Sequence, residues 1–193
     1  KFFGRAVMGA CAVLLGHSAC DAQVHLDRIT LPQGFAIDVY AENVDNARSL
    51  ARSESGVVYV GTRTNGSVYA LVDSDGDFNA ETRHVIASGL NMPNGVAVKD
   101  GALYVAEVSR IWRYDNIEAS LANLPKPVLV TSELPADRMH GWKFIAFGPD
   151  GMLYATSGDA SNPDTAQDPA SLNGKILRMT PTGEAPAGNP TAG

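Results

Sequence analysis

A chain of 193 residues, 45% hydrophobic and 19% charged, is long enough and apolar enough to bury a core. Its net charge of −6, without any cluster of Lys and Arg, excludes the basic footprint of nucleic-acid-binding proteins, so we expect no nucleic-acid partner. Nineteen Gly and eleven Pro, with few long helical patterns, favour short strands joined by turns. The composition therefore predicts an all-β fold.

The first residues have the pattern of an export signal. Lys1 and Arg5 precede an uncharged run that reaches Cys20, and the apolar centre of this run is too short to cross a bilayer as a helix. We expect a signal peptide at residues 1–22 and a mature chain at 23–193 that is periplasmic or secreted. Cys20 also fits a lipoprotein cleavage site, and the protein would be tied to a membrane only if Cys20 carried a lipid anchor.

The first predicted element of the mature chain is a strand at residues 35–39. Phe35, Ile37 and Val39 alternate with polar or small residues, which is the period of a half-buried strand. We expect this strand to open the folded domain.

A pattern of strand, Gly turn and strand ending in apolar-apolar-Tyr then occurs three times, at residues 48–61, 95–106 and 144–156. A third strand is expected after each copy, at residues 66–71, 109–114 and 174–179. The repeated tyrosines, Tyr59, Tyr104 and Tyr154, are 45 and 50 residues apart, a period typical of propeller blades. A β-sandwich, the alternative, needs no such period, so we predict about three blades of a β-propeller.

Two segments interrupt this rhythm. Residues 117–124 are expected to form a short helix-like insertion, and residues 161–173 a polar loop that follows the third hairpin. Function in propellers lies on the loops at one end of the channel, so residues at the hairpin ends are the first candidates for a site.

His140 is the leading catalytic candidate, because we expect it at the start of the inner strand of the third copy. A histidine there can act as a general base near neutral pH and take a hydroxyl proton. The alternative is a structural histidine packed under Trp142. Asn94, in Met92-Pro-Asn-Gly95, can orient a substrate hydroxyl or bind a cation, or it can simply supply the left-handed turn that Asn-Gly sequences favour.

Three carboxylates alternate at Asp73, Asp75 and Asp77, as at the start of a calcium loop. Gly76 stands in the fourth place and His84, instead of Glu, in the twelfth, so a solvated turn is favoured over a metal site. The chain also lacks the glycine-rich, zinc-protease, nucleophile-elbow and Cys-x-x-Cys motifs, which removes support for nicotinamide-dependent, nucleotide-binding, zinc-protease and α/β-hydrolase functions.

Two ordered motifs carry a resemblance to a known family. Residues 140–159, HGWKFIAFGPDGMLYATSGD, and residues 173–190, NGKILRMTPTGEAPAGNP, resemble the glucose/sorbosone dehydrogenases that use pyrroloquinoline quinone. The resemblance extends over residues 31–190. It implies a six-bladed β-propeller, of which this chain is the N-terminal part, with the quinone and a calcium ion at the channel mouth and His140 as the general base.

The resemblance does not decide the substrate or all of the site residues. Met139 and Pro93 stand where glucose-oxidising members have an acidic residue and Gln, so the sugar can be glucose, sorbosone or another aldose. Trp142 and Arg63 are further candidates for contact with substrate or quinone. Most of the quinone and calcium ligands are expected beyond this chain, so we expect the fragment alone to be inactive. A calcium-dependent sugar lactonase, with Asn94 on the metal, and a non-catalytic binding propeller are the alternatives.

Overall fold

The computed structural model describes residues 25–189, which belong to two units, one ending at Asp38 and the other starting at Val39. In the first unit the described residues form one short 3-10 turn, η1 (Leu26–Arg28). The predicted signal peptide and Cys20 lie outside the described residues. Among the described residues, no helix is long and apolar enough to cross a membrane.

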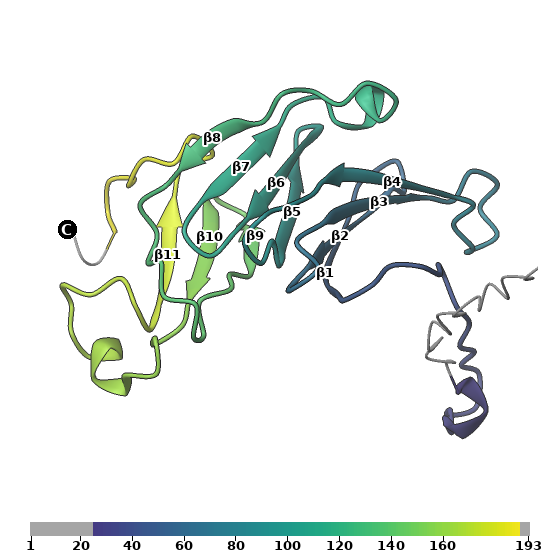
Figure 1. Cartoon of the computed structure of the whole chain (residues 1–193), viewed down its shortest axis with the longest axis horizontal. Coiled ribbons are helices and arrows are strands. Elements are labelled where there is room, and N and C mark those ends of the chain that lie inside the picture. The colour runs from purple at the N-terminus through teal and green to yellow at the C-terminus, as the bar shows by residue number, and fades with distance from the viewer. Residues whose placement is uncertain (1–24, 190–193) are drawn as a thin grey trace, which may run out of the picture. The chain divides into compact units, whose positions relative to one another are not determined.

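The second unit contains three antiparallel sheets, each a simple meander (Figure 1). The first sheet has the order β1 (Ala47–Arg52), β2 (Val58–Thr62), β3 (Val68–Val72) and β4 (Thr82–Ala87). The second has the order β5 (Gly95–Lys99), β6 (Ala102–Ala106), β7 (Ile111–Tyr114) and β8 (Val128–Thr131). The third has the order β9 (Ile145–Phe147), β10 (Leu153–Ser157) and β11 (Lys175–Met179).

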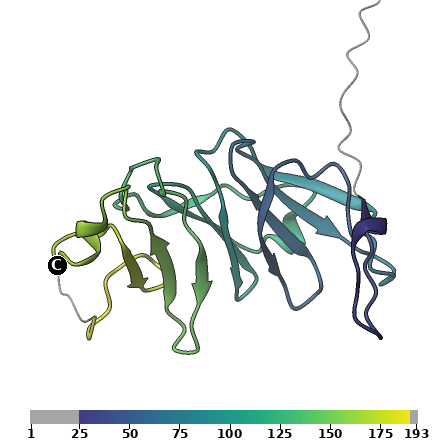
Figure 2. The same ribbon diagram turned by 90° about the horizontal axis from the view of Figure 1, so that it is seen from below.

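The three sheets are arranged as successive blades of a β-propeller, so the predicted fold class is confirmed. The first strand of the second sheet, β5, contacts both β1 and β9, and the sheets follow one another side by side in Figure 2. One core cluster joins the first two sheets through side chains such as Tyr59, Val68, Leu103 and Val105. Another joins the second and third sheets through Tyr104, Ile111, Ile145 and Leu153. Face-to-face packing of apolar strand faces is what holds neighbouring blades together.

The sequence predicted the first three strands of every blade but missed the fourth ones. β4 and β8 are outer strands whose residues are mostly exposed or half-buried, so they lack a continuous apolar pattern. The insertion at residues 117–124 contains the 3-10 turn η2 (Glu118–Ser120), and the polar loop at 161–173 contains η3 (Pro163–Ala166).

The strand predicted at residues 35–39 is absent. This segment is irregular, and Phe35 and Ile37 are 72% and 44% exposed. Alternating side chains favour a strand only where a neighbouring strand supplies a ladder of hydrogen bonds, and no ladder includes these residues. The prediction from alternation alone was therefore wrong.

Candidate functional site

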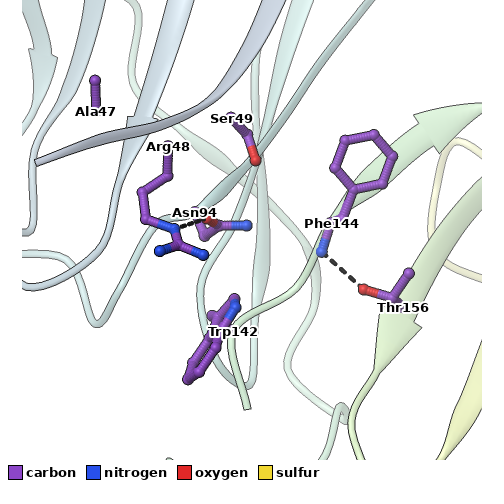
Figure 3. A pocket seen from close by; sticks show the side chains of 7 residues that line it. All are labelled: Ala47, Arg48, Ser49, Asn94, Trp142, Phe144 and Thr156. Carbon is purple, nitrogen blue, oxygen red and sulfur yellow. Dashed lines mark hydrogen bonds between the residues drawn. The ribbon is translucent and has the colours of Figure 1, made fainter. Parts of the chain in front are cut away.

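The site lies at one edge of the three blades, where β1, β5 and β9 begin and β2 and β10 end. Because neighbouring strands are antiparallel, the start of one strand and the end of the next lie at the same edge. The residues gathered there are Arg48, Arg63, Asn94, His140, Trp142 and Asp159, and Figure 3 shows three of them facing a shared hollow.

Arg48 is placed by a β-bulge. Ala47 pairs with Thr62 and Ser49 with Gly61, so Arg48 is an extra residue in β1. Bulges re-aim side chains and are common beside functional sites. The Nε of Arg48 donates a hydrogen bond to Oδ1 of Asn94 at 3.3 Å, as Figure 3 shows.

Asn94 is buried and joins the blades. Its Nδ2 donates to the backbone carbonyl of Lys143 at 2.7 Å, while its Oδ1 accepts from Arg48. The left-handed residue of this loop is Met92, with φ of 50°, so the alternative that Asn94 supplies a left-handed turn was wrong. Gly61 lets the loop approach, since a Cβ there would lie 2.2 Å from the Asn94 carbonyl oxygen.

Two guanidinium groups lie close to the Trp142 ring. Cζ of Arg63 is 3.9 Å from the indole centroid, and Cζ of Arg48 is 5.8 Å from it, both within reach of a cation–π interaction. The Nε of Arg63 is buried without a hydrogen-bond partner. Trp142 and Arg63 were predicted as candidate site residues without a contact between them, and the structure places them side by side.

His140 is not at the start of a strand, because β9 begins five residues later at Ile145. It lies in a turn with φ of 53°, a conformation that cannot continue a β-ladder. A Cβ on Gly158 would be 2.1 Å from the His140 carbonyl oxygen, so this backbone contact requires glycine. The prediction that His140 opens the inner strand was wrong, yet its place at the hairpin mouth is fixed by tight packing.

His140 forms a dyad with Asp159 at the far end of the same hairpin. Nδ1 of His140 lies 2.6 Å from Oδ1 of Asp159. An ionised carboxylate only accepts hydrogen bonds, so Nδ1 donates to it, and in the neutral imidazole Nε2 then presents a lone pair. The hydrogen bond from His140 is the main cause that lowers the pKa of Asp159, and the backbone N–H of Ser161 adds to it. Asp159 thereby remains ionised and fixes the tautomer of the histidine.

The structural alternative, a histidine packed under Trp142, fits this geometry only in part, because the rings do touch but the side chain stays half exposed. The two rings meet edge to face at 6.4 Å, and the His140 side chain is 52% exposed. Within the described residues, no group forms a hydrogen bond with Nε2. The imidazole is thus fixed through Nδ1, while Nε2 has no hydrogen-bond partner among the described residues.

Lys143 stabilises the turn that contains His140. Its side chain is buried, and Nζ donates to the carbonyl of Gly141 at 2.8 Å. Burial lowers the pKa of this ammonium group, although the charge of Asp137 opposes the effect. A Cβ on Gly141 would lie 1.6 Å from the Asp137 carbonyl oxygen, so this turn, too, is closely packed.

The open hollow beside Trp142 measures about 460 Å³. It is lined by Ala47, Arg48, Ser49, Asn94, Trp142, Phe144 and Thr156, all drawn in Figure 3. Thr156 is oriented by the backbone N–H of Phe144, which donates to its Oγ1 at 2.9 Å. Hydroxyl, amide and guanidinium groups beside aromatic rings can hold a small polar molecule and orient it.

The aspartates of the possible calcium loop lie elsewhere. They form the turn between β3 and β4, at the edge of the first blade opposite to Arg63 and the hollow. With Glu81, which the sequence reading missed, ligand atoms of Asp73, Asp75 and Asp77 lie within 4.8 Å of one another. Asp73 also accepts hydrogen bonds from the backbone N–H groups of Gly76 and Phe78, which close the turn.

Arg48, Lys143 and Asp159 are site residues that the sequence reading did not single out. The bulge that aims Arg48 depends on pairing between strands, which no local pattern reveals. Asp159 ends the hairpin that His140 precedes, and a hairpin returns to its starting edge, so its position could have been inferred. Nothing in the sequence indicates that Lys143 is buried.

The glucose/sorbosone dehydrogenase family model matches residues 96–193, which is just over half of the chain. The chain belongs to this family. No curated protein sequence matches it.

Solved structures agree with this family. The PQQ-bound aldose sugar dehydrogenase of Streptomyces coelicolor is 30% identical, with a TM-score of 0.62, over 80% of this chain and 50% of that one. An oxidoreductase of Thermus thermophilus, assigned as a glucose dehydrogenase, is 25% identical, with a TM-score of 0.64, over 81% and 50%. The PQQ domain of Coprinopsis cinerea pyranose dehydrogenase shares the fold at 12% identity, with a TM-score of 0.56, over 65% and 31%. The chain thus spans half or less of the length of these structures.

Proposed function

We propose that this chain is part of a quinoprotein dehydrogenase that oxidises an aldose sugar or a sorbosone-like substrate with pyrroloquinoline quinone. Membership of the glucose/sorbosone dehydrogenase family supports the reaction class, and the similar Streptomyces protein is a PQQ-bound aldose sugar dehydrogenase. The observation that carries the proposal is the His140–Asp159 dyad, whose histidine ring lies 6.4 Å from the ring of Trp142, a residue that lines the polar hollow.

In this mechanism His140 is the general base. Its Nε2 takes the proton from the sugar hydroxyl, while Asp159 holds Nδ1–H and stabilises the imidazolium that forms. The quinone, when bound, accepts the two electrons and the hydrogen that leave the sugar carbon. Ser49, Asn94 and Thr156 line the hollow with groups that can orient sugar hydroxyls.

The residues of this chain could form part of a binding site for such a quinone. Trp142 offers a flat aromatic face, and Arg63 lies on this face with a buried Nε that has no acceptor in the described residues. A planar, anionic quinone matches an aromatic surface combined with a guanidinium group. At this edge the described residues offer no cluster of carboxylates for calcium, and no step of the mechanism depends on that ion.

The geometry disfavours the two alternatives. A lactonase would need Asn94 as a metal ligand, but its Oδ1 already accepts a hydrogen bond from the cationic Arg48, which would repel a metal ion. A non-catalytic binding propeller would not require a half-exposed histidine whose tautomer is fixed by an aspartate.

The test replaces His140 in the full-length protein. His140→Gln retains hydrogen bonding but cannot take a proton at neutral pH, so turnover with an aldose should fall about 10²- to 10⁴-fold, while quinone affinity changes little. Dye reduction after reconstitution measures turnover, and absorbance titration measures cofactor binding. His84→Gln is the matched control, since His84 lies on the outer strand β4 away from the site.

Near-normal turnover of His140→Gln would show that His140 has a structural role and is not the general base. A wild-type protein that binds no quinone would contradict the dehydrogenase and favour the lactonase.

We also propose that the protein is exported, because Lys1 and Arg5 precede a short apolar run. Residues 1–30 fused to a reporter that is active only outside the cytoplasm should give signal. The same fusion with the apolar run interrupted by two arginines should be silent. A reporter that is silent in the unaltered fusion would argue against export.

A further inference from the structure

The ammonium group of Lys175, the first residue of β11, is bound by backbone carbonyl groups. Its Nζ donates hydrogen bonds to the carbonyl oxygens of Thr165, Ala166 and Asn173, at 2.7, 3.1 and 3.1 Å. An ammonium group has three N–H donors, so these three bonds use its full capacity. Among the described residues, Lys175 forms no ion pair with a carboxylate. The lysine therefore acts on the loop before it and not on another charged side chain.

This loop, residues 159–174, connects β10 to β11 and closes on itself (Figure 1). The N–H of Gly174 donates to the carbonyl of Gly158 at 2.9 Å, so the two ends of the loop meet. A Cβ on Gly174 would lie 2.8 Å from Cα of Ala166, so the returning chain is tightly packed. These are the features of a compact Ω-loop, whose conformation depends on its own internal contacts.

The same loop positions Asp159. Thr165, whose carbonyl accepts from Lys175, donates through its Oγ1 to the Asp159 carbonyl at 3.3 Å. The N–H of Ser161 donates to Oδ1 of Asp159 at 3.0 Å, and Ser161 has a φ of 63°. Serine adopts this left-handed conformation only where the surrounding structure supports it. The carboxylate that accepts from Nδ1 of His140 therefore keeps its place only while the loop keeps its conformation.

A second contact links the loop to the chain that precedes His140. Asn173, whose carbonyl also accepts from Lys175, donates through Nδ2 to Oδ2 of Asp137 at 3.3 Å. Lys175 thus binds both residues, Thr165 and Asn173, through which the loop contacts the dyad and the chain before it.

We infer that Lys175 is a positioning residue for His140. By closing the loop of residues 159–174, its ammonium group holds Asp159 where this carboxylate orients the imidazole. The inference rests on the proposed function for the role of His140 as the base. Misplacing a reacting group by about 1 Å can slow an enzyme about 100-fold, so an indirect contact of this kind can matter for turnover.

The first test is Lys175→Ala in the full-length protein reconstituted with quinone. Turnover with an aldose should fall about 10- to 100-fold, while the KM for the sugar and the affinity for quinone change less than about twofold. Added methylammonium should raise the turnover of this variant several-fold, because a small ammonium ion can donate to the same carbonyl groups. Tetramethylammonium has the same charge but no N–H donor and should not.

The second test needs neither quinone nor sugar. Proton NMR of the cofactor-free, full-length protein should show the Nδ1–H signal of His140 at low field, since this proton is hydrogen-bonded to a carboxylate. Its absence from His140→Gln assigns the signal. It should broaden or disappear in Lys175→Ala and return with methylammonium. A lysine that only stabilised the fold would lower the unfolding midpoint and leave the signal of the folded protein unchanged.

The matched control is Lys126→Ala, at an exposed position before β8. It should equal the wild type in both tests, with and without methylammonium. If Lys175→Ala fails to fold, Lys175→Gln retains part of the aliphatic stem and two N–H donors, and should show both losses to a smaller extent.

A variant that keeps both the turnover and the Nδ1–H signal would overturn the inference, as would a fall in turnover with the signal intact. Recovery with tetramethylammonium as strong as with methylammonium would also overturn it, because hydrogen bonds to the carbonyl groups would then not be needed. A wild-type protein that oxidises no sugar would refute the proposed function, whereas the NMR comparison would still decide whether Lys175 holds the dyad.

Discussion

Asp159 is the residue whose ionisation couples the site to the stability of the fold. His140 lowers its pKa below the ordinary value of 3.8, so the folded chain binds this proton less readily than the unfolded chain. The carboxylate therefore stabilises the fold above pH 3.8. This contribution is lost as the pH falls below 3.8 and passes the lowered pKa.

Asp159→Asn should remove this acid-dependent contribution. Urea unfolding of the full-length protein should show that the variant is less stable than the wild type at pH 7, and that the difference narrows as the pH falls below the ordinary pKa of 3.8. Asp45→Asn, at an exposed position, serves as the control. A difference between wild type and Asp159→Asn that stays constant with pH would show that the hydrogen bond does not stabilise the ionised form.

At the scale of elements, the loop before β5 connects three blades through Asn94. This side chain accepts from Arg48 of the first blade and donates to the Lys143 carbonyl before the third. The contact is buried, and Gly61 and Gly95 leave the space that it needs, since a Cβ on Gly95 would lie 2.8 Å from that carbonyl oxygen. Blade packing and site geometry therefore depend on the same hydrogen bonds.

Asn94→Ala should destabilise the full-length protein by about 1–3 kcal/mol, because it leaves the buried carbonyl oxygen of Lys143 without this donor. Thermal unfolding measures the effect, and Asn123→Ala, at an exposed position, is the control. An unfolding midpoint unchanged from the wild type would mean that water replaces the lost donor at no cost.

At the scale of the second unit, the first and third sheets each expose large apolar side chains. Leu50, 64% exposed, lines an apolar hollow of about 740 Å³ on the outer face of the first sheet. On the third sheet Phe144 and Ile176 are 51% and 73% exposed. Exposed apolar side chains of this kind promote association or aggregation unless another layer covers them.

Residues 31–193 expressed alone should therefore be marginally stable or aggregate. Light scattering and binding of a hydrophobic dye report this behaviour. The double variant Leu50→Ser and Ile176→Ser should reduce aggregation of the fragment, because both side chains are exposed there. A monomeric fragment with a sharp cooperative melt would contradict the prediction.

The sequence predicted most of the inner architecture because each blade repeats a local pattern. The apolar-apolar-Tyr strands, the Gly-Pro-Asp-Gly turn after Phe147 and the third strands are local signals, and all appear in the structure. The strand at residues 35–39 failed, and β4 and β8 were missed. Outer strands and isolated segments are decided by the neighbours they pair with, so their own residues say little about them.

Within the site, sequence alone determined the candidates His140, Asn94, Trp142 and Arg63, as residues at hairpin mouths or in a family motif. Only the tertiary structure decided that Asp159 holds His140, that Arg48 leaves the β1 ladder, and that both arginines lie on Trp142. Turns and alternation are encoded within a few residues. Hydrogen bonds, close glycine contacts and cation–π contacts between blades join residues that are 33 positions apart (Gly61 and Asn94) to 94 positions apart (Arg48 and Trp142), and only the packing of one blade on the next brings them together.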